Sequence, residues 1–220
     1  MLTILRSGTF SESLKSTKRT AINFLAHLYL SGKHNEIAVG NFMGDFVKGS
    51  QLDRFPEMVA KGIILHREID NYTDNHPIVG QSKDKLREKY RHYSGVIVDM
   101  YYDHFLAVNF SDYHPSPLEE FAREKYELLE NHWELIPPRG QNMLPYMIRG
   151  DWLTNYAKKE GIHRSLTGLS RRTKFKSNLD LAIQDLVEYY DELELEFRQF
   201  FEEIRAHISQ FREDLIISKL

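Results

Sequence analysis

The chain of 220 residues contains no cysteine. This absence excludes disulfides, thiolate nucleophiles and cysteine-ligated zinc sites, so any metal chemistry has to use histidine and carboxylate side chains. Long apolar runs are also missing. No stretch approaches the roughly 20 residues of a membrane span, and the N-terminal segment has only scattered apolar residues in place of a signal-peptide core. We therefore expect a soluble, cytoplasmic protein.

A strong excess of charge of one sign is missing too. A net charge of -3 with 28% charged residues gives no bulk electrostatic reason to expect a nucleic acid or membrane partner. The hydrophobic fraction of 41%, with 12% aromatic residues, is typical of globular proteins. Because the length suits one large domain, we expect residues 22–215 to form it. Residues 1–21, rich in Ser, Thr and Lys, are predicted to be a flexible extension.

Alternating β patterns are absent, whereas apolar residues recur every three or four positions along most of the chain. The clearest example is segment 179–208, where Leu179, Ile183 and Leu186 begin a continuous apolar stripe. Similar spacing or high helix propensity is found in segments 22–31, 35–49, 56–75, 82–110, 116–132 and 141–158. The sequence therefore predicts an all-α fold, a single helical bundle of about seven helices.

The segment ILHREIDNYTDNHP concentrates groups that can bind a metal or carry a proton. In a helix, His66 and Asp70 lie one turn apart and project from the same face. Taken alone, this pair could equally be a local contact on a solvated surface. Asp74 and His76 precede a proline, and we expect them to shape the end of the helix.

Three other segments place acidic or histidine side chains on predicted helices. Asp99 and Asp103 are four residues apart, a spacing at which like charges destabilise a helix unless a cation lies near; His104 follows directly. Asp45 has apolar neighbours, and burying its carboxylate without compensation costs several kcal/mol. His27 also lies among apolar residues, where a hydrogen-bonded core histidine is the commoner case.

A divalent ion shared by these groups would compensate for their burial. Histidines and carboxylates converging from several helices suit Mn²⁺, Mg²⁺, Fe²⁺ or Zn²⁺, and spacing alone does not choose among them. Basic side chains gather in two places. In segment 83–91 they alternate with acids, as on an ordinary solvated surface, whereas segment 171–176 has no acid and could contact phosphate or an acidic protein.

Several short motifs, in this order and spacing, resemble those of the acyl carrier protein phosphodiesterases, also called holo-ACP hydrolases. They are INFLAHLYL, GNFMGDFVKG, HREIDNYTDNHP, DMYYDHFL and LTGLSRR, and the resemblance extends from about Ala21 to about Phe200. Members of that family typically begin with Met where this chain has Ile22. The resemblance implies an all-α fold distantly related to the HD-domain phosphohydrolases. It also implies a hydrolase favouring Mn²⁺, which removes 4'-phosphopantetheine from the serine of holo-acyl carrier protein.

The same resemblance implies the residues of a metal site. Asp45, in the GDF segment, corresponds to the aspartate regarded as central in the family. His66 and Asp70 correspond to the HRxID motif, and Asp99 and Asp103 to the DxxxDH motif. With His27 as a further candidate ligand, the predicted metal set is His27, Asp45, His66, Asp70, Asp99 and Asp103. The predicted catalytic set is Asp45, His66, Asp70 and His104, where His104 is a candidate proton donor to the departing serine.

An acidic carrier protein would need a basic docking surface on this acidic chain. The candidates for contact with phosphate or with the carrier protein are Arg67, Arg171, Arg172 and Lys174.

Two other interpretations remain open at the level of sequence. An HD-like phosphohydrolase acting on a nucleotide or another small phosphodiester would use the same metal chemistry. Such proteins usually contain an adjacent His-Asp pair, but here Asp103 and His104 occur in the reverse order. A helical module that binds metal or protein without turnover would also fit these motifs.

Overall fold

A computed structural model describes residues 23–50, 52–173 and 177–218 of the chain. Every regular element within these ranges is helical, which confirms the predicted all-α fold class. None of the helices in these ranges has both the length and the apolar character needed to cross a bilayer. The predicted extension, residues 1–21, lies outside the described residues, as does Lys174.

The helices are short except for α3 and α12. In chain order the elements are α1 (Phe24–Leu30), α2 (Asn35–Met43), the 3₁₀ turn η1 (Gly44–Phe46), α3 (Glu57–Asn75), α4 (Pro77–Tyr90), η2 (Arg91–Tyr93), α5 (Ser94–Val108), α6 (Phe110–Tyr113), α7 (Leu118–Asn131), η3 (Trp133–Leu135), α8 (Pro138–Arg149), α9 (Trp152–Asn155), α10 (Lys159–Ser170), η4 (Leu179–Leu181), α11 (Ala182–Glu188) and α12 (Tyr190–Ile217).

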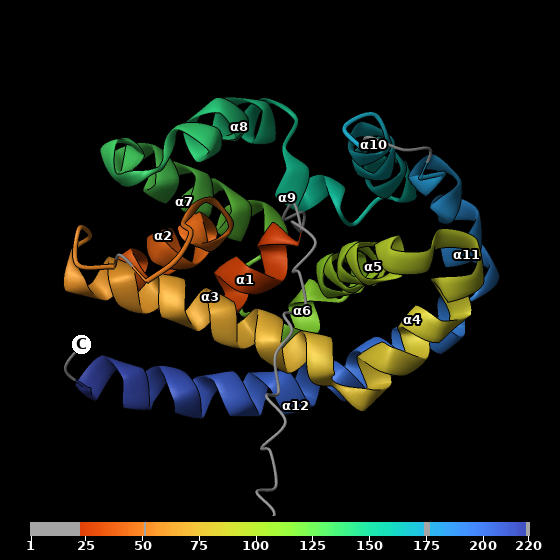
Figure 1. The fold of residues 1–220 in the computed structure, drawn as a ribbon, viewed down its shortest axis with the longest axis horizontal. Coiled ribbons are helices and arrows are strands. Elements are labelled where there is room, and N and C mark those ends of the chain that lie inside the picture. The colour runs from red at the N-terminus through yellow and green to blue at the C-terminus, as the bar shows by residue number, and fades with distance from the viewer. Residues whose placement is uncertain (1–22, 51, 174–176, 219–220) are drawn as a thin grey trace, which may run out of the picture.

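The two long helices, α3 and α12, run antiparallel along one side of the molecule (Figure 1). Lys61, near the start of α3, is 2% exposed and reaches the last turn of α12. Its ammonium donates to the carbonyls of Ile216 at 3.0 Å and Ser218 at 2.8 Å, and pairs with Glu57 at 2.7 Å. These carbonyls would otherwise end the helix without partners, so one buried cation joins the two helices.

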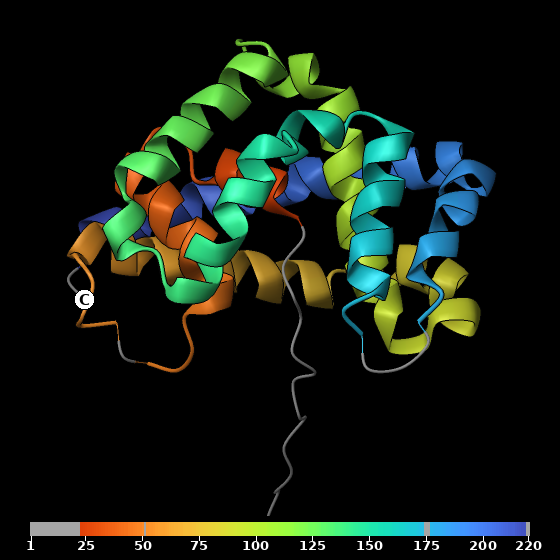
Figure 2. The same ribbon diagram turned by 90° about the horizontal axis from the view of Figure 1, so that it is seen from above.

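The short helix α1 lies near the centre of the molecule. Seen from above, α2, α7 and α8 lie toward one end of the molecule, and α4, α5, α10 and α11 lie toward the other end (Figure 2). Its residues Leu25 and Leu28 are fully buried, as is Phe105 on α5. The hydrophobic core therefore surrounds α1, and any polar side chain on this helix is held in a dry environment.

Helices α2 and α3 cross at two glycines. A Cβ atom built on Gly40 would lie 2.0 Å from the carbonyl oxygen of Val59, and one built on Gly62 would lie 2.2 Å from that of Ile37. The backbones of the two helices therefore touch at this point, at a separation that no larger residue permits.

The seven predicted segments match most helices, but four of them are broken into shorter elements, so the described residues form more helices than the seven predicted. Segment 35–49 divides into α2 and η1. Segment 82–110 is interrupted at Arg91, where φ is +50°, and segment 141–158 at Asp151, where φ is +42°. Both are non-glycine residues with a positive φ, so neither position carried the glycine that would have predicted a break in the helix. Segment 179–208 divides at Tyr189, and α10 lies in a region for which no helix was predicted.

The glycine crossing predicts a large effect of a single methyl group. We expect Gly62→Ala to reduce the free energy of unfolding by about 1–3 kcal/mol or more, because its Cβ would overlap a backbone carbonyl. Gly80→Ala is the matched control. Gly80 is also helical, but a Cβ there has no neighbour within 4 Å, and we expect a gain of about 0.5–1 kcal/mol. Urea denaturation of both variants measures the difference, and equal stabilities would contradict the close crossing.

Candidate metal centre

The structure brings together four of the predicted site residues, from three elements. His27 comes from α1, Asp45 from η1, and His66 and Asp70 from α3. The Nε2 atom of His66 lies 3.4 Å from Asp70 and 3.8 Å from Asp45, and Nε2 of His27 lies 3.3 Å from Asp70. Ligand atoms of His27, His66 and Asp70 all lie within 4.8 Å of one another, the one such group found among the described residues.

Burial in the cluster is uneven. The two imidazole rings stack at 4.3 Å between centroids, and the side chains of His27 and His66 are only 3% and 6% exposed. The side chain of Asp45 is 14% exposed and that of Asp70 is 37% exposed. The cluster is therefore closed on its histidine side and open to solvent at its carboxylates.

Asn41 on α2 orients the ring of His27. Its amide nitrogen donates to the backbone carbonyl of His27 at 2.8 Å and to the hydroxyl of Ser31 at 2.9 Å. Its amide oxygen therefore faces Nδ1 of His27, 2.8 Å away, and Nδ1–H donates to it. The other ring nitrogen, Nε2, is left facing Asp70. Second-sphere hydrogen bonds of this kind orient histidine ligands in metal sites.

Gly44 makes room for the ring of His66. A Cβ on Gly44 would lie only 2.1 Å from Cγ of His66, so the imidazole packs directly against the backbone of η1. The next residue in η1 is Asp45, so this close contact also brings its carboxylate to the ring. Nδ1 of His66 is buried and has no hydrogen-bond partner within the described ranges, which leaves Nε2 as the ring atom that meets the carboxylates.

The charges in the cluster are strongly coupled. Burial lowers the pKa of His27, but contact with the Asp70 carboxylate outweighs burial and raises it to about 9. Burial raises the pKa of Asp70, yet its contacts with both histidines outweigh this and hold it well below the usual range. A positive charge is thus favoured between these side chains, supplied by a proton or by a metal ion.

The donor set itself fits a divalent ion. Two imidazoles and one carboxylate are a combination that suits Mn²⁺, Fe²⁺ or Zn²⁺. Nε2 of His27 is buried without a hydrogen-bond partner of good geometry, although it lies beside a carboxylate. A buried nitrogen of this kind is costly unless something binds it. A cation at this point would satisfy the nitrogen and the carboxylate together.

Asp103, another of the predicted metal-site residues, has its hydrogen-bond partners on α1. It is fully buried on α5, and its two oxygens accept hydrogen bonds from the backbone N–H groups of Leu25 at 3.0 Å and Ala26 at 2.9 Å. These N–H groups belong to the first turn of α1, whose N-cap residue Asn23 provides no side-chain hydrogen bond. Asp103 therefore caps α1 from a neighbouring helix and fixes the helix that carries His27. Burial raises its pKa to about 7.

His104, on α5, has its hydrogen-bond partners outside the four clustered residues. His104 donates from Nδ1 to the carbonyl of Tyr156 at 2.7 Å and accepts at Nε2 from the hydroxyl of Tyr190 at 3.2 Å. Burial lowers its pKa. Asp99, one turn before Asp103 on α5, lines a narrow crevice that also includes Ala26 and Ile69, the sequence neighbours of His27 and Asp70.

The predicted basic residues lie in two places. Arg67, beside His66 on α3, donates to the carbonyl of Gly49 at 2.7 Å and so fastens the loop after Asp45. Arg171 and Arg172 follow the end of α10 and are exposed.

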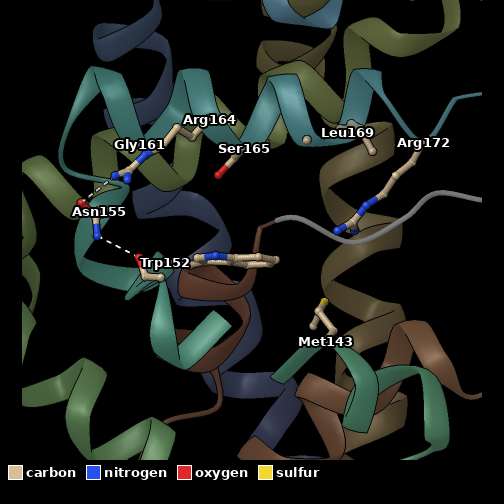
Figure 3. A pocket seen from close by; sticks show the side chains of 10 residues that line it. Met143, Trp152, Asn155, Gly161, Arg164, Ser165, Leu169 and Arg172 are labelled. Carbon is tan, nitrogen blue, oxygen red and sulfur yellow. Dashed lines mark hydrogen bonds between the residues drawn. The ribbon is translucent and has the colours of Figure 1, made fainter. Parts of the chain in front are cut away.

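Arg172 lines a cavity of about 260 Å³, together with Trp152, Asn155 and Arg164. Figure 3 shows the Trp152 indole between Asn155 and Arg164 on one side and Arg172 on the other. The indole also contacts Phe24 on α1, with 6.5 Å between ring centroids. Phe24 precedes His27 by three residues, so the aromatic contact extends from the cavity to the helix that carries part of the cluster.

Asn41, Gly44 and Trp152 are not among the functional residues predicted from sequence. Asn41 is a fully buried amide on an otherwise apolar face of α2, four residues before Asp45, and that pattern was a usable signal. Gly44 gave no comparable signal, because its role depends on the packing of a ring that is 22 residues further along the chain. Trp152 follows the unpredicted break at Asp151.

Comparison with known proteins identifies the family. The family model described as acyl carrier protein phosphodiesterase matches residues 22–204, which include every residue of the cluster. The chain belongs to the acyl carrier protein phosphodiesterase family. This membership confirms the resemblance drawn from the short motifs.

Individual members of the family are similar over most of their length. The acyl carrier protein phosphodiesterase of Enterobacter sp. strain 638 is 35% identical over 181 residues, covering 82% of this chain and 94% of that protein. The enzymes of the same name from Photorhabdus laumondii and Escherichia coli K12 are 33% and 34% identical. These alignments cover 82% and 86% of this chain, and 91% and 98% of those proteins. No solved structure matches this chain.

The buried position of His104 predicts a pH dependence of stability. Burial lowers the pKa of His104 in the folded protein, whereas in the unfolded chain the pKa is about 6.5. The unfolded chain therefore binds the proton more tightly, and protonation favours unfolding as the pH falls through this range. Wild-type stability should therefore be lost as the pH falls from 7 to 5, and His104→Gln should reduce this loss. Thermal unfolding across this pH range measures the effect. His163→Gln, at an exposed position on α10, is the control, and equal slopes for the two variants would contradict the prediction.

Proposed function

We propose that this protein is a metal-dependent phosphodiesterase that hydrolyses holo-acyl carrier protein. Water and the phosphodiester bond between serine and 4'-phosphopantetheine would give the free serine hydroxyl of apo-carrier protein and released 4'-phosphopantetheine. The observation that carries the proposal is the buried His27, His66 and Asp70 group in a member of this family. The relatives bear the name of this activity over nearly their whole length.

The proposed ligands are His27, His66 and Asp70, and the proposed ion is Mn²⁺, with Fe²⁺, Zn²⁺ or Mg²⁺ as alternatives. A divalent ion at such a site supplies Lewis acidity toward water and toward the phosphoryl oxygens. This assignment is narrower than the set predicted from sequence. We propose that Asp103 supports α1 and that His104 does not take part in the chemistry, because the hydrogen bonds of these two side chains go to other partners. A place for Asp99 at the metal remains a prediction from sequence.

We propose that Asp45 handles the proton of the attacking water. Its carboxylate is partly exposed and lies 3.8 Å from His66, so it can face both the ligand group and the solvent side. Asp45 would take the proton as water attacks phosphorus, and would return it to the serine oxygen as the ester bond breaks. Asn41 and Gly44 take no part in proton transfer. They position the imidazole rings of His27 and His66 before substrate binds.

The cavity around Trp152 is the proposed binding place for the pantetheine arm. Trp152 and Met143 offer apolar surface to its carbon chain. The amide nitrogen of Asn155 already donates to two backbone carbonyls, but its oxygen has capacity to accept from a peptide N–H of the arm. Arg172, exposed at the rim, would meet the acidic carrier protein. A role in docking for Arg171 and Lys174 remains a prediction from sequence alone.

We also propose, as part of this function, a distant relation to the HD-domain phosphohydrolases and a single catalytic domain over residues 22–215. The supporting feature is a set of histidine and carboxylate ligands on helices of an all-α fold. The adjacent His-Asp pair usual in HD proteins is absent from the sequence. Hydrolysis of a nucleotide, the usual reaction of HD proteins, is therefore the second candidate function. Mass spectrometry of holo-acyl carrier protein separates it from the first.

Mass spectrometry of holo-acyl carrier protein, incubated with this protein and Mn²⁺, tests the reaction. We expect metal-dependent conversion to the apo mass, abolished by EDTA. Asp70→Asn should lower the rate by at least about 100-fold, since loss of a ligand exceeds the effect of an outer hydrogen bond. Asp74→Asn is the matched control: this carboxylate lies one turn further along α3 and pairs with Lys83, so turnover should stay near the wild-type rate. Hydrolysis of nucleotides but not of holo-carrier protein would favour the second candidate.

Measuring metal binding distinguishes two possible roles of Asp45, proton acceptor and metal ligand. We expect Asp45→Asn to abolish turnover while Mn²⁺ binding, measured by electron paramagnetic resonance, stays close to wild type. Asp70→Asn should lose both, because Asp70 is a proposed ligand. Thermal unfolding of each variant checks that the fold is intact. Loss of Mn²⁺ binding in Asp45→Asn would make Asp45 a ligand instead of a proton acceptor.

Reversing the charge of Arg172 tests its role in docking the acyl carrier protein. We expect Arg172→Glu to raise KM for holo-acyl carrier protein about tenfold at low salt, with a smaller effect at high salt and little change in kcat. Hydrolysis of the small diester bis(p-nitrophenyl) phosphate should be unaffected. Arg123→Glu, an exposed charge reversal on α7, is the control. Equal losses on both substrates would place Arg172 at the reacting phosphate.

A further inference from the structure

A second, larger cavity opens at the other end of α1. Its volume is about 730 Å³, within the range of small-molecule sites, and none of its lining residues belongs to the metal cluster or to the cavity around Trp152. The walls come from the end of α1 and the loop that follows, from α6 and α7, and from α12. The cavity has an aromatic part, formed by Tyr29, Tyr113, His114 and Phe121, and a charged part, formed by Lys33, Glu124, Lys125, Glu202, Arg205 and Arg212.

Lys125 is the unusual residue of this cavity. The residue as a whole is 8% exposed, yet its ammonium makes no hydrogen bond or ion pair with any residue in the ranges 23–50, 52–173 and 177–218. The ammonium is not among the unpartnered side-chain atoms of these ranges that are cut off from solvent, so it faces the cavity that the residue lines. The ammonium lies 5.0 Å from the centroid of the Phe121 ring. Lys61, the other buried lysine described above, has two carbonyls and a carboxylate as partners. The stem of Lys125 is thus packed in the protein while its ammonium, without a protein anion, is available to a negatively charged group in the cavity.

Two arginines on α12 are held at the same cavity. The guanidinium of Arg205 lies over the rings of Tyr113, at 5.3 Å, and Tyr29, at 5.9 Å, and pairs through Nη1 with Glu202 at 2.9 Å. Arg212 donates through Nη1 to the carbonyl of Leu30 at 2.7 Å. Each contact orients a guanidinium that has five N–H donors, so further donors are available to a ligand. Planar guanidinium groups fixed in this way match phosphate and carboxylate oxygens.

The balance of charge favours an anion. Four cationic side chains line the cavity against the two carboxylates of Glu124 and Glu202. Glu202 is already paired with Arg205. Burial also lowers the pKa of Lys125, which is the expected response of an ammonium with little compensation. An anion bound at this ammonium would provide that compensation.

We propose that this cavity binds a small organic anion, with its phosphate or carboxylate head at Lys125 and Arg212 and its apolar or aromatic body against Tyr29, Tyr113 and Phe121. The site is separate from the proposed hydrolytic centre, and the inference does not rest on the proposed function. Phosphate and carboxylate share the chemistry that these cations recognise, and the experiment distinguishes them.

Isothermal titration calorimetry of the full-length protein in EDTA tests the proposal, with phenyl phosphate and benzoate as probes. We expect wild type to bind at least one of them and not to bind phenol, which has the ring without the anionic head. Tighter binding of phenyl phosphate would identify a phosphate head, and tighter binding of benzoate a carboxylate head. Lys125→Met should weaken binding by at least about tenfold, the loss expected for a hydrogen bond to a charged group. It should unfold at the same or a higher temperature, because methionine buries no charge.

Two further variants make the result specific to the cavity. Arg123→Met removes a cation from the same helix, α7, at an exposed position outside the cavity lining, and should bind like wild type. Arg212→Met should weaken binding as Lys125→Met does, and it serves the same purpose if the lysine variant fails to fold. Absence of binding by wild type at millimolar probe, or equal affinity in wild type, Lys125→Met and Arg212→Met, would overturn the proposal.

Discussion

The contact between the backbones of α2 and α3 is the constraint on which the rest of the site depends. Because Gly40 and Gly62 have no side chains, the two helices approach until carbonyl groups face α-carbons. The residues after each glycine are therefore held beside α1, where the Asn41 side chain bonds to His27 and the ring of His66 stacks on the same histidine. Asn41 follows the first glycine directly, and His66 lies one turn beyond the second. The polar groups meet because two non-polar residues of minimum size precede them.

Around this crossing, the polar side chains of the cluster are arranged in two layers. His27, His66 and Asp70 face one another, while Asn41 and Asp103 bind the helix that carries His27. The outer layer makes neutral or backbone hydrogen bonds that are complete within the protein. The inner layer leaves Nε2 of His27 buried beside the Asp70 carboxylate without a hydrogen-bond partner of good geometry. This contrast between satisfied and unsatisfied groups separates residues that hold the structure from residues available to a ligand.

The sequence predicted the all-α class and the pairing of His66 with Asp70, because both follow from the spacing of residues within one helix. It could not distinguish Asp103 from Asp70. A buried carboxylate can be stabilised by a cation or by backbone N–H groups, and either solution looks the same in a list of apolar neighbours. The unsatisfied first turn of α1 that Asp103 binds is 77 residues away in the chain. The breaks at Arg91 and Asp151 were equally hidden, since non-glycine residues occupy the left-handed conformation there.

The bond from Lys61 to the end of α12 has a consequence for any shortened version of the chain. The family model ends at residue 204, whereas the carbonyls that accept from Lys61 belong to residues 216 and 218. A protein trimmed to the shared family region would keep all four clustered residues but would lose two of the acceptors of a buried ammonium on the same helix as His66 and Asp70. Its remaining partner, Glu57, lies largely in solvent. The last turns of α12 thus support α3 from outside the region that the family model matches.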